Sequence, residues 1–499
     1  MDSRKNALSQ TEIRQNRSSK SFSSHMQLRP IMRGHQSGLV ETTNPATGEH
    51  LESYPIFSDD EVAQVARRAR AAFEKWRKLS VDERSDYLRK LASALRAKKN
   101  DYAKLMTLEM GKPISQSESE IDKCAWTAEY YAENTKSWLA EEHVETDAKS
   151  SFVEFDPLGV ILSVMPWNYP FWQVLRFAIP TVVAGNTSIL RHSTACPGSA
   201  LAVEEAFENA GFPESVFTSV ITGHDTVAKL MASKEISGVS LTGSVEAGRK
   251  IGELAAQNFK KFVLELGGSD PYIVLEDADV REAARAGADA RVLNSGQSCI
   301  AAKRFIVVES AAGEFVEEFV SQMGKKKTGD PMDAETDVGP LVNVEAVKTL
   351  DEQVRSSVSK GARVRVGGKP LPGKGAFYPP TVLDNVKLDM KVIREEVFGP
   401  VAPVYVVRDE AEAINVANDS DFGLGSSLWT TDMERARRVA REIQSGMVFV
   451  NALTKSDPRM PFGGVKRSGI GRELSKYGLR EFVNVKSVNI YGTFIPRAG

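Results

Sequence analysis

Short apolar runs alternate with helical patterns through the middle of the chain. VILSVM (160–165), SILR (188–191) and VSLT (239–242) have the composition of short buried strands. Amphipathic segments, LAVEEAFENA and GRKIGELAAQ among them, lie between and after these runs. Strands that alternate with helices are typical of βαβ units, so the pattern predicts a parallel sheet covered by helices.

A second series of strand-like runs follows the first: KFVLEL, PYIVLE, RFIVV, VAPVYVV and GMVFVN. A chain of 499 residues is too long for one hydrophobic core. We therefore expect an α/β protein with two parallel-sheet, Rossmann-like domains in tandem. Ahead of both series, Ser58 with Glu61 and Ser80 with Glu83 have the spacing of helix capping boxes and predict two helices.

Two strand-like pieces fit neither series: SFVEF at 151–155 and EFVNVKSVNIY near the C-terminus. An exposed strand edge is a template on which another chain can pair. We therefore expect residues 138–157 and 481–499 to form a small β arm that joins copies of the chain into a homo-oligomer, a dimer or a tetramer.

The composition excludes several classes of function. With 64 basic and 66 acidic residues, the chain gives no electrostatic reason to bind nucleic acid or an anionic membrane, and no apolar run reaches the ~18 residues of a membrane span. Its three scattered cysteines make neither a disulfide framework nor paired zinc ligands, so we expect no metal and a reducing compartment.

Residues 1–38 are basic and serine-rich, with only Asp2 and Glu12 acidic, which is typical of a disordered or targeting tail. We expect a cytoplasmic protein, with the mitochondrial matrix as the alternative that a transit peptide would imply.

One cysteine, Cys299, ends a small polar stretch, NSGQSC (294–299), although free cysteines usually enter hydrophobic cores. The thiolate is the attacking form of cysteine, and an accessible turn near positive charge lowers the pKa of a thiol. The pattern therefore indicates a nucleophile, with an inert structural thiol as an equal alternative.

Three further stretches carry groups suited to act with such a thiol. Glu265 follows apolar residues, and its burial would raise its pKa toward that of a general base, unless it forms a salt bridge at the strand end. Asn168 lies between prolines in PWNYPFW (166–172), a rigid loop whose amide can reach an oxyanion, although alone it would be a turn asparagine. Gly243 and Ser244 begin a helix after a strand, a weak sign of phosphate binding.

Taken together, these motifs resemble the aldehyde dehydrogenase superfamily from about Asn44 to the C-terminus. They are, in order, PWNYPFW, LTGS, LELGGSDP, NSGQSC, EEVFGP and PFGGVKRSGIGRE, and within the superfamily the chain is most similar to the succinate-semialdehyde dehydrogenase branch. The resemblance implies an NAD(P)-binding domain of residues 39–137 and 158–266 and a catalytic domain of residues 267–457.

The resemblance also implies a reaction. Cys299 attacks the aldehyde, and the side chain of Asn168 and the backbone N–H of Cys299 hold the oxyanion of the resulting thiohemiacetal. Hydride transfer to the nicotinamide leaves a thioester, and Glu265 activates the water that releases the acid. The residues implied at the cofactor are Trp167, Arg191, Thr194, Gly243, Ser244, Glu396 and Phe398.

The cofactor motif departs from the family pattern. ILRHSTACPG has Arg191 where relatives carry a lysine, and Thr194 where NAD-preferring relatives carry a glutamate. A glutamate at this position would repel a ribose 2′-phosphate, so its absence removes that repulsion. Arg191 with His192 can pair with such a phosphate. We expect NADP or NAD as the cofactor, with NADP favoured; an arginine that only tolerates NAD is the alternative.

Arg176 and Ser456 match positions that face the substrate in relatives that bind the carboxylate of succinate semialdehyde. Leu293 stands where some of them carry a second arginine, so Arg459 is another possible partner of a carboxylate. We expect succinate semialdehyde or a similar short carboxylated aldehyde as the substrate. A broader or uncharged-aldehyde specificity is the alternative.

Three other functions compete with this interpretation. CoA-acylating relatives lack the glutamate base, so Glu265 argues against them. A non-catalytic structural protein needs none of Cys299, Glu265 and Asn168. A thiol hydrolase needs a histidine beside its cysteine, and no histidine motif in the sequence indicates one.

Overall fold

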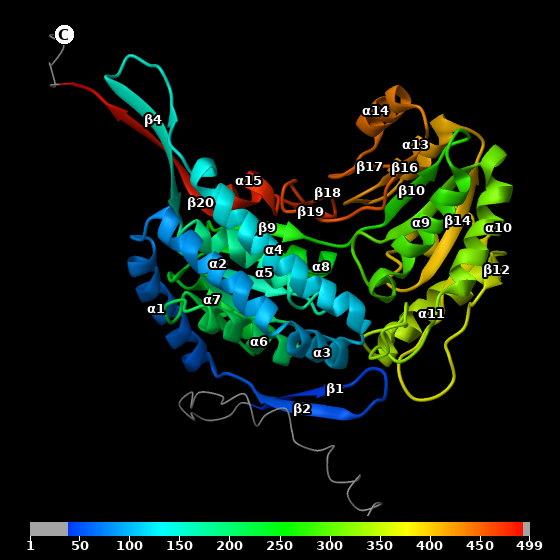
Figure 1. Ribbon diagram of the computed structural model, residues 1–499, viewed down its shortest axis with the longest axis horizontal. Helices are drawn as coiled ribbons and strands as arrows, with labels where there is room; N and C mark the ends of the chain where they lie inside the picture. The colour runs from blue at the N-terminus through cyan, green and yellow to red at the C-terminus, as the bar shows by residue number, and fades with distance from the viewer. Residues whose placement is uncertain (1–37, 493–499) are drawn as a thin grey trace, which may run out of the picture.

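A computed structural model describes residues 38–492 and shows two α/β lobes with a ribbon of strands projecting from one of them (Figure 1). One lobe runs from blue to green in Figure 1 and the other from green to orange. The expected α/β architecture with two largely parallel sheets is confirmed. The expected domain boundaries stay a prediction.

The sheet of the first lobe has six strands in the order β19-β9-β8-β5-β6-β7, all parallel except β19. The strands are β5 (Val160–Met165), β6 (Thr187–His192), β7 (Phe217–Val220), β8 (Ile236–Thr242), β9 (Lys261–Glu265) and β19 (Gly469–Ile470). The three strands predicted between residues 160 and 242 are confirmed, whereas β7 was not predicted. The central strands β5 and β6 are buried along almost their whole length because helices cover both faces of the sheet.

Helices on the two faces of this sheet belong to different hydrophobic clusters. One face packs against α2 (Val81–Ala97), α4 (Ile114–Trp138), α5 (Trp172–Val183) and α6 (Pro197–Asn209). The other packs against α1 (Asp59–Trp76), α7 (His224–Ala232) and α8 (Val245–Gln257). Along β5, Ile161 enters the first cluster while Val160 and Leu162 enter the second, as the alternation of a strand requires.

Both predicted capping boxes are confirmed. The hydroxyl of Ser58 accepts from the N–H of Glu61 while the Glu61 carboxylate accepts from the N–H of Ser58, and α1 begins there. Ser80 and Glu83 do the same at α2. Two elements near these helices were not predicted: α3 (Lys99–Met110), and a hairpin of β1 (Leu39–Thr43) and β2 (His50–Pro55).

The sheet of the second lobe has seven strands in the order β12-β13-β14-β11-β10-β16-β17, all parallel except β12. They are β10 (Asp270–Val274), β11 (Ala302–Val308), β12 (Arg363–Val366), β13 (Thr381–Asp384), β14 (Val401–Val407), β16 (Ser427–Trp429) and β17 (Phe449–Val450). The helices and short strands of this part of the chain are α9 (Val280–Val292), α10 (Glu309–Lys325), α11 (Val344–Ser359), α12 (Lys391–Arg394), α13 (Glu410–Asn418), α14 (Met433–Glu442), α15 (Ser475–Leu479), β15 (Phe422–Gly423) and β18 (Val465–Lys466).

The projecting ribbon is an antiparallel sheet in the order β20-β4-β3 (Figure 1). In it, β4 (Ser150–Pro157) pairs along its whole length with β20 (Val483–Ile490), and β3 (Glu142–His143) covers the other edge of β4. The two strand-like pieces that fitted neither series therefore belong to one sheet. Its role in assembly stays a prediction.

The predicted N-terminal tail, apart from Gly38, and the last residues of the predicted arm lie outside the described residues. Between residues 38 and 492, no helix combines the length and apolar composition needed to cross a membrane.

Candidate active site

The stretch that ends in Cys299 forms a tight left-handed turn between α9 and β11. Asn294, Ser295 and Gly296 have φ angles of 54°, 55° and 76°. A Cβ at Gly296 would lie 2.3 Å from the backbone of Gly399, so glycine is required there. The small residues of this stretch therefore permit its left-handed backbone and its close approach to neighbouring chain.

Two buried cations hold the backbone of this turn through hydrogen bonds to its carbonyl groups. Arg291 donates to the carbonyl of Gly296 at 2.7 Å. The Lys303 ammonium donates to the carbonyls of Ser298 and Cys299 at 2.8 and 2.6 Å. The backbone beside the thiol is therefore held by charge-assisted hydrogen bonds, which are stronger than neutral ones.

Asn168 lies in the loop after β5 and is tied to the same turn. Its side-chain N–H donates to the carbonyl of Gln297 at 3.0 Å, and the side chain of Asn294 donates to the Asn168 carbonyl at 2.6 Å. The structure thus brings Asn168 to the turn that ends in Cys299, although the two residues lie far apart in the chain.

Glu265 is the last residue of β9, and its chain continues to Gly268, where a Cβ would lie 2.5 Å from the Cys299 carbonyl oxygen. Neither oxygen of the Glu265 carboxylate accepts a hydrogen bond from the described residues. Burial, with the nearby Glu473 carboxylate, raises the pKa of Glu265 well above its usual value. A buried carboxyl with free oxygens is suited to take up a proton, as predicted for a general base.

The environment of the Cys299 thiol differs from the expectation. Burial raises its pKa to about 12, although Arg176 and Lys303 lower it in part. The prediction that the turn itself lowers the pKa of the thiol is wrong, because the surrounding low-polarity packing outweighs the two cations. The thiol therefore needs a base to lose its proton near neutral pH.

The predicted cofactor residues lie at or just after the ends of β5, β6 and β8 and in the segment before β14. Ser244 caps α8 by accepting from Ala247, and a Cβ at Gly248 would lie 2.5 Å from Leu266, so α8 packs closely on the sheet. Trp167 and Phe398 meet edge to face at 5.8 Å. The Glu396 carboxylate accepts from the N–H of Gly268 at 3.0 Å and lies 3.4 Å from the Lys303 ammonium, which links this group to the thiol turn.

Of the residues expected around a 2′-phosphate, Arg191 and Thr194 remain candidates, whereas His192 is excluded. Thr194 is exposed, and Arg191 donates to the carbonyl of Thr222, whose buried hydroxyl has no partner among the described residues. The prediction that His192 joins Arg191 is wrong: its buried ring contacts the Pro170 carbonyl at 3.0 Å.

Burial lowers the pKa of His192 to about 4, so its ring is neutral near neutral pH. A second histidine, the exposed His224, was not predicted near Arg191, whose guanidinium lowers the pKa of its ring.

The two predicted substrate residues have different partners. Arg176, on α5, is buried, forms an ion pair with Glu473 and stacks over the Phe462 ring at 4.3 Å. Ser456 accepts from the Lys123 ammonium at 2.6 Å. Lys123 and Glu473 were not predicted as site residues, although Glu473 is the last residue of the PFGGVKRSGIGRE motif.

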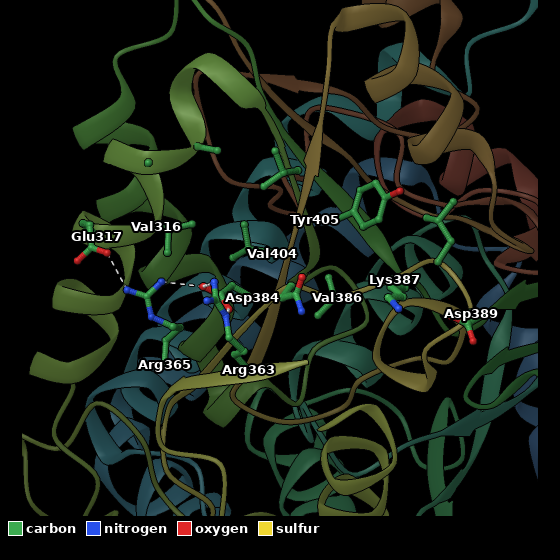
Figure 2. Close-up of a pocket in the computed structure, with 15 residues that line it drawn as sticks. Val316, Glu317, Arg363, Arg365, Asp384, Val386, Lys387, Asp389, Val404 and Tyr405 are labelled. Carbon is green, nitrogen blue, oxygen red and sulfur yellow. Dashed lines mark hydrogen bonds and ion pairs between the residues drawn. The ribbon is translucent and has the colours of Figure 1, made fainter. Parts of the chain in front are cut away.

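A hollow of about 800 Å³ lies elsewhere, between α10, β13 and β14 (Figure 2). Its arginines are already paired, because Arg363 and Arg365 both bind Asp384 and Arg365 also binds Glu317 (Figure 2). None of the predicted site residues lines it, so it adds nothing to the chemistry around Cys299.

The geometry agrees with what comparison with known proteins finds. The model of the aldehyde dehydrogenase family matches residues 32–488. The chain belongs to the aldehyde dehydrogenase family. As an aldehyde dehydrogenase it is 47% identical, over 90% of its length and 99% of the other protein, to a "probable succinate-semialdehyde dehydrogenase" of Synechocystis named for NADP⁺.

Two further aldehyde dehydrogenases illustrate the likeness. The succinate semialdehyde dehydrogenase of Escherichia coli named for NAD(P)⁺ is 43% identical, over 89% of this chain and 96% of that one. The crystal structure of succinic semialdehyde dehydrogenase from Streptococcus pyogenes in complex with NADP⁺ has a TM-score of 0.89 and 38% identity, covering 91% of this chain and 100% of that one.

Proposed function

We propose that this aldehyde dehydrogenase oxidises a short aldehyde with a distal carboxylate, succinate semialdehyde first, and prefers NADP. The observation that carries the proposed chemistry is the Cys299 turn hydrogen-bonded to Asn168, with the buried, unpartnered carboxyl of Glu265 on the adjoining strand. The substrate class is supported by the names of the relatives and by the cations near the thiol, Arg176 and Lys303.

In this mechanism the thiol of Cys299 gives its proton to solvent, and its sulfur forms a bond to the aldehyde carbon. The second N–H of the Asn168 side chain and the N–H of Cys299 stabilise the oxyanion. A bound nicotinamide supplies the acceptor for the hydride that leaves this carbon. The thioester that remains on Cys299 is attacked by water, whose proton passes to Glu265 and from there to the departing sulfur, so that the acid and the free thiol are released.

The residues present fit a dinucleotide that carries a 2′-phosphate. Arg191 offers a charge, Thr194 adds no repelling carboxylate, and the buried Thr222 hydroxyl is free of partners among the described residues. Glu396 can hold the nicotinamide ribose, beside Trp167 and Phe398. Comparison of kcat/KM for NADP and NAD tests the preference, and a strong preference for NAD would contradict it.

One observation favours a second candidate, an aldehyde dehydrogenase of broader specificity. Arg176, the expected carboxylate ligand, is already neutralised by Glu473. A panel of succinate semialdehyde, glutarate semialdehyde and uncharged aldehydes, each with both cofactors, separates the candidates. Higher kcat/KM for the acids supports the proposed substrate class, and equal or lower values support the broader one.

We also propose that the arm joins copies of the chain in a reducing, cytoplasmic setting. The supporting observations are the exposed apolar side chains of Val485, Ile490 and Tyr491 on or beside β20, and three cysteines that are all free. Light scattering after size exclusion tests the assembly: Val485→Asp should dissociate it, and a monomeric unaltered protein would contradict the proposal. Fusion of residues 1–38 to a fluorescent protein tests the location.

A further inference from the structure

Lys123 is a part-buried cation with unusual surroundings. It projects from α4, its ammonium lies 4.2 Å from the centre of the Trp172 ring, and it donates to the Ser456 hydroxyl at 2.6 Å. A ring face and a hydroxyl oxygen compensate only in part for the water that an ammonium loses on burial. Burial and the Arg176 guanidinium accordingly lower the pKa of Lys123 to about 8.

The acidic groups near Lys123 are all engaged by other cations. Glu120 pairs with Lys112 and also caps α5 by accepting from the N–H groups of Phe171 and Trp172. Asp457 binds Arg459 through both of its oxygens.

The other neighbours of Lys123 give it no negative charge either. The remaining carboxylate of this region, that of Glu473, pairs with Arg176. The buried thiol of Cys124 has a pKa raised well above its usual value, so it is neutral. Between residues 38 and 492, therefore, no carboxylate lies within ion-pair distance of the Lys123 ammonium.

Lys123 and the Cys299 thiol share a charged neighbour, Arg176. The guanidinium of Arg176 influences the pKa of both Cys299 and Lys123, so it is within electrostatic reach of each. Trp172, which the ammonium covers, belongs to the hydrophobic cluster against which Cys299 packs. The Lys123 ammonium and the Cys299 thiol therefore both border the same hydrophobic cluster.

We propose that the Lys123 ammonium, with the Ser456 hydroxyl, binds the distal carboxylate of the substrate, so that Lys123 sets the preference for carboxylated aldehydes. This inference rests on the proposed function and changes the assignment made from the sequence, in which Arg176 bound the carboxylate. Arg176 instead positions Glu473, and the exposed Arg459 is held by Asp457. Lys123 also supplies a second positive charge, which some relatives carry as an arginine at the position of Leu293.

The test compares two substrates of one shape. In 4-methylpentanal, two methyl groups replace the carboxylate oxygens of succinate semialdehyde, so the ratio of their kcat/KM values reports recognition of the charge. Lys123→Met keeps the length of the side chain and removes its charge. A lost charge-assisted hydrogen bond corresponds to a fall of about 10- to 100-fold in this ratio, mainly through KM of the acid.

Two variants control the result. Lys123→Arg retains the charge and should retain most of the ratio. Lys136→Met alters an exposed lysine of the same helix, which pairs with Asp82, and should leave the ratio unchanged.

Three outcomes would overturn the inference. A wild-type enzyme that prefers the acid while Lys123→Met keeps that preference refutes the role of Lys123 and leaves the proposed function standing. Equal losses with both aldehydes in Lys123→Met indicate a purely structural lysine. A wild-type enzyme with no preference for the acid refutes both the inference and the proposed substrate class.

Discussion

The turn that carries Cys299 and the cationic group around Arg176 and Lys123 both belong to the proposed active site, but they differ in how far the sequence predicts them. The turn depends on contiguous residues whose backbone geometry is local: three left-handed residues and a glycine that admits no side chain. The cationic group depends on which carboxylate each cation meets, and Lys123 meets Ser456 across 333 positions of the chain. A motif therefore indicates a candidate nucleophile, whereas the charges that we propose select the substrate emerge only from tertiary pairing.

The largest expected effect is on the nucleophile. Cys299→Ala should lower kcat by roughly 10⁴-fold or more, because no other group can form the thioester. Cys196→Ala, at a buried cysteine away from the turn, is the matched control and should keep its activity. Production of NADPH from succinate semialdehyde measures both, and substantial turnover by Cys299→Ala would contradict the assignment.

The next effect concerns the oxyanion. Asn168→Ala should lower kcat by about 10²- to 10³-fold, as loss of a preorganised donor does elsewhere. It also removes the hydrogen bond to Gln297, so the thermal midpoint should be measured alongside. Asn168→Asp, which keeps the shape but opposes the developing negative charge, should be no more active than Asn168→Ala; near-normal activity in either variant refutes an oxyanion role.

A smaller effect is expected at the cofactor. Thr194→Glu places a carboxylate near the proposed 2′-phosphate site and should lower kcat/KM for NADP by about tenfold or more, with little change for NAD. Thr194→Gln has the same shape without the charge and should stay close to the wild type. If both variants affect the two cofactors alike, Thr194 does not face the phosphate.

The smallest effect tests the charge of Lys123 through pH. The pKa of Lys123 lies at about 8, so the ammonium is present below this pH and is lost above it. KM for succinate semialdehyde should therefore rise by about fourfold between pH 7 and pH 8.5, whereas KM for 4-methylpentanal stays level. The hydrogen bond from Arg459 lowers the pKa of Asp457, so this neighbouring carboxylate stays ionised over the range. A parallel rise for both aldehydes would contradict the prediction.

Much of the fold followed from apolar periodicity. β5 occupies the predicted residues 160–165. Both capping boxes could be predicted because a serine and a glutamate three residues apart are enough to define one. The hairpin of β1 and β2 was not predicted because its strands are polar and half-exposed. Without a buried face, polar and apolar residues do not alternate along them. His192 was misjudged for a related reason: a sequence does not reveal that a histidine points inward.

The proposed reaction depends on a thioester at Cys299 that Glu265 helps to hydrolyse. Mass spectrometry of Glu265→Gln after incubation with succinate semialdehyde and NADP tests it most directly. The account predicts one succinyl group per chain, on the peptide that contains Cys299, with Cys124 and Cys196 unmodified. Fast turnover by this variant without such an adduct, or an adduct on either of the other two cysteines alone, would contradict it.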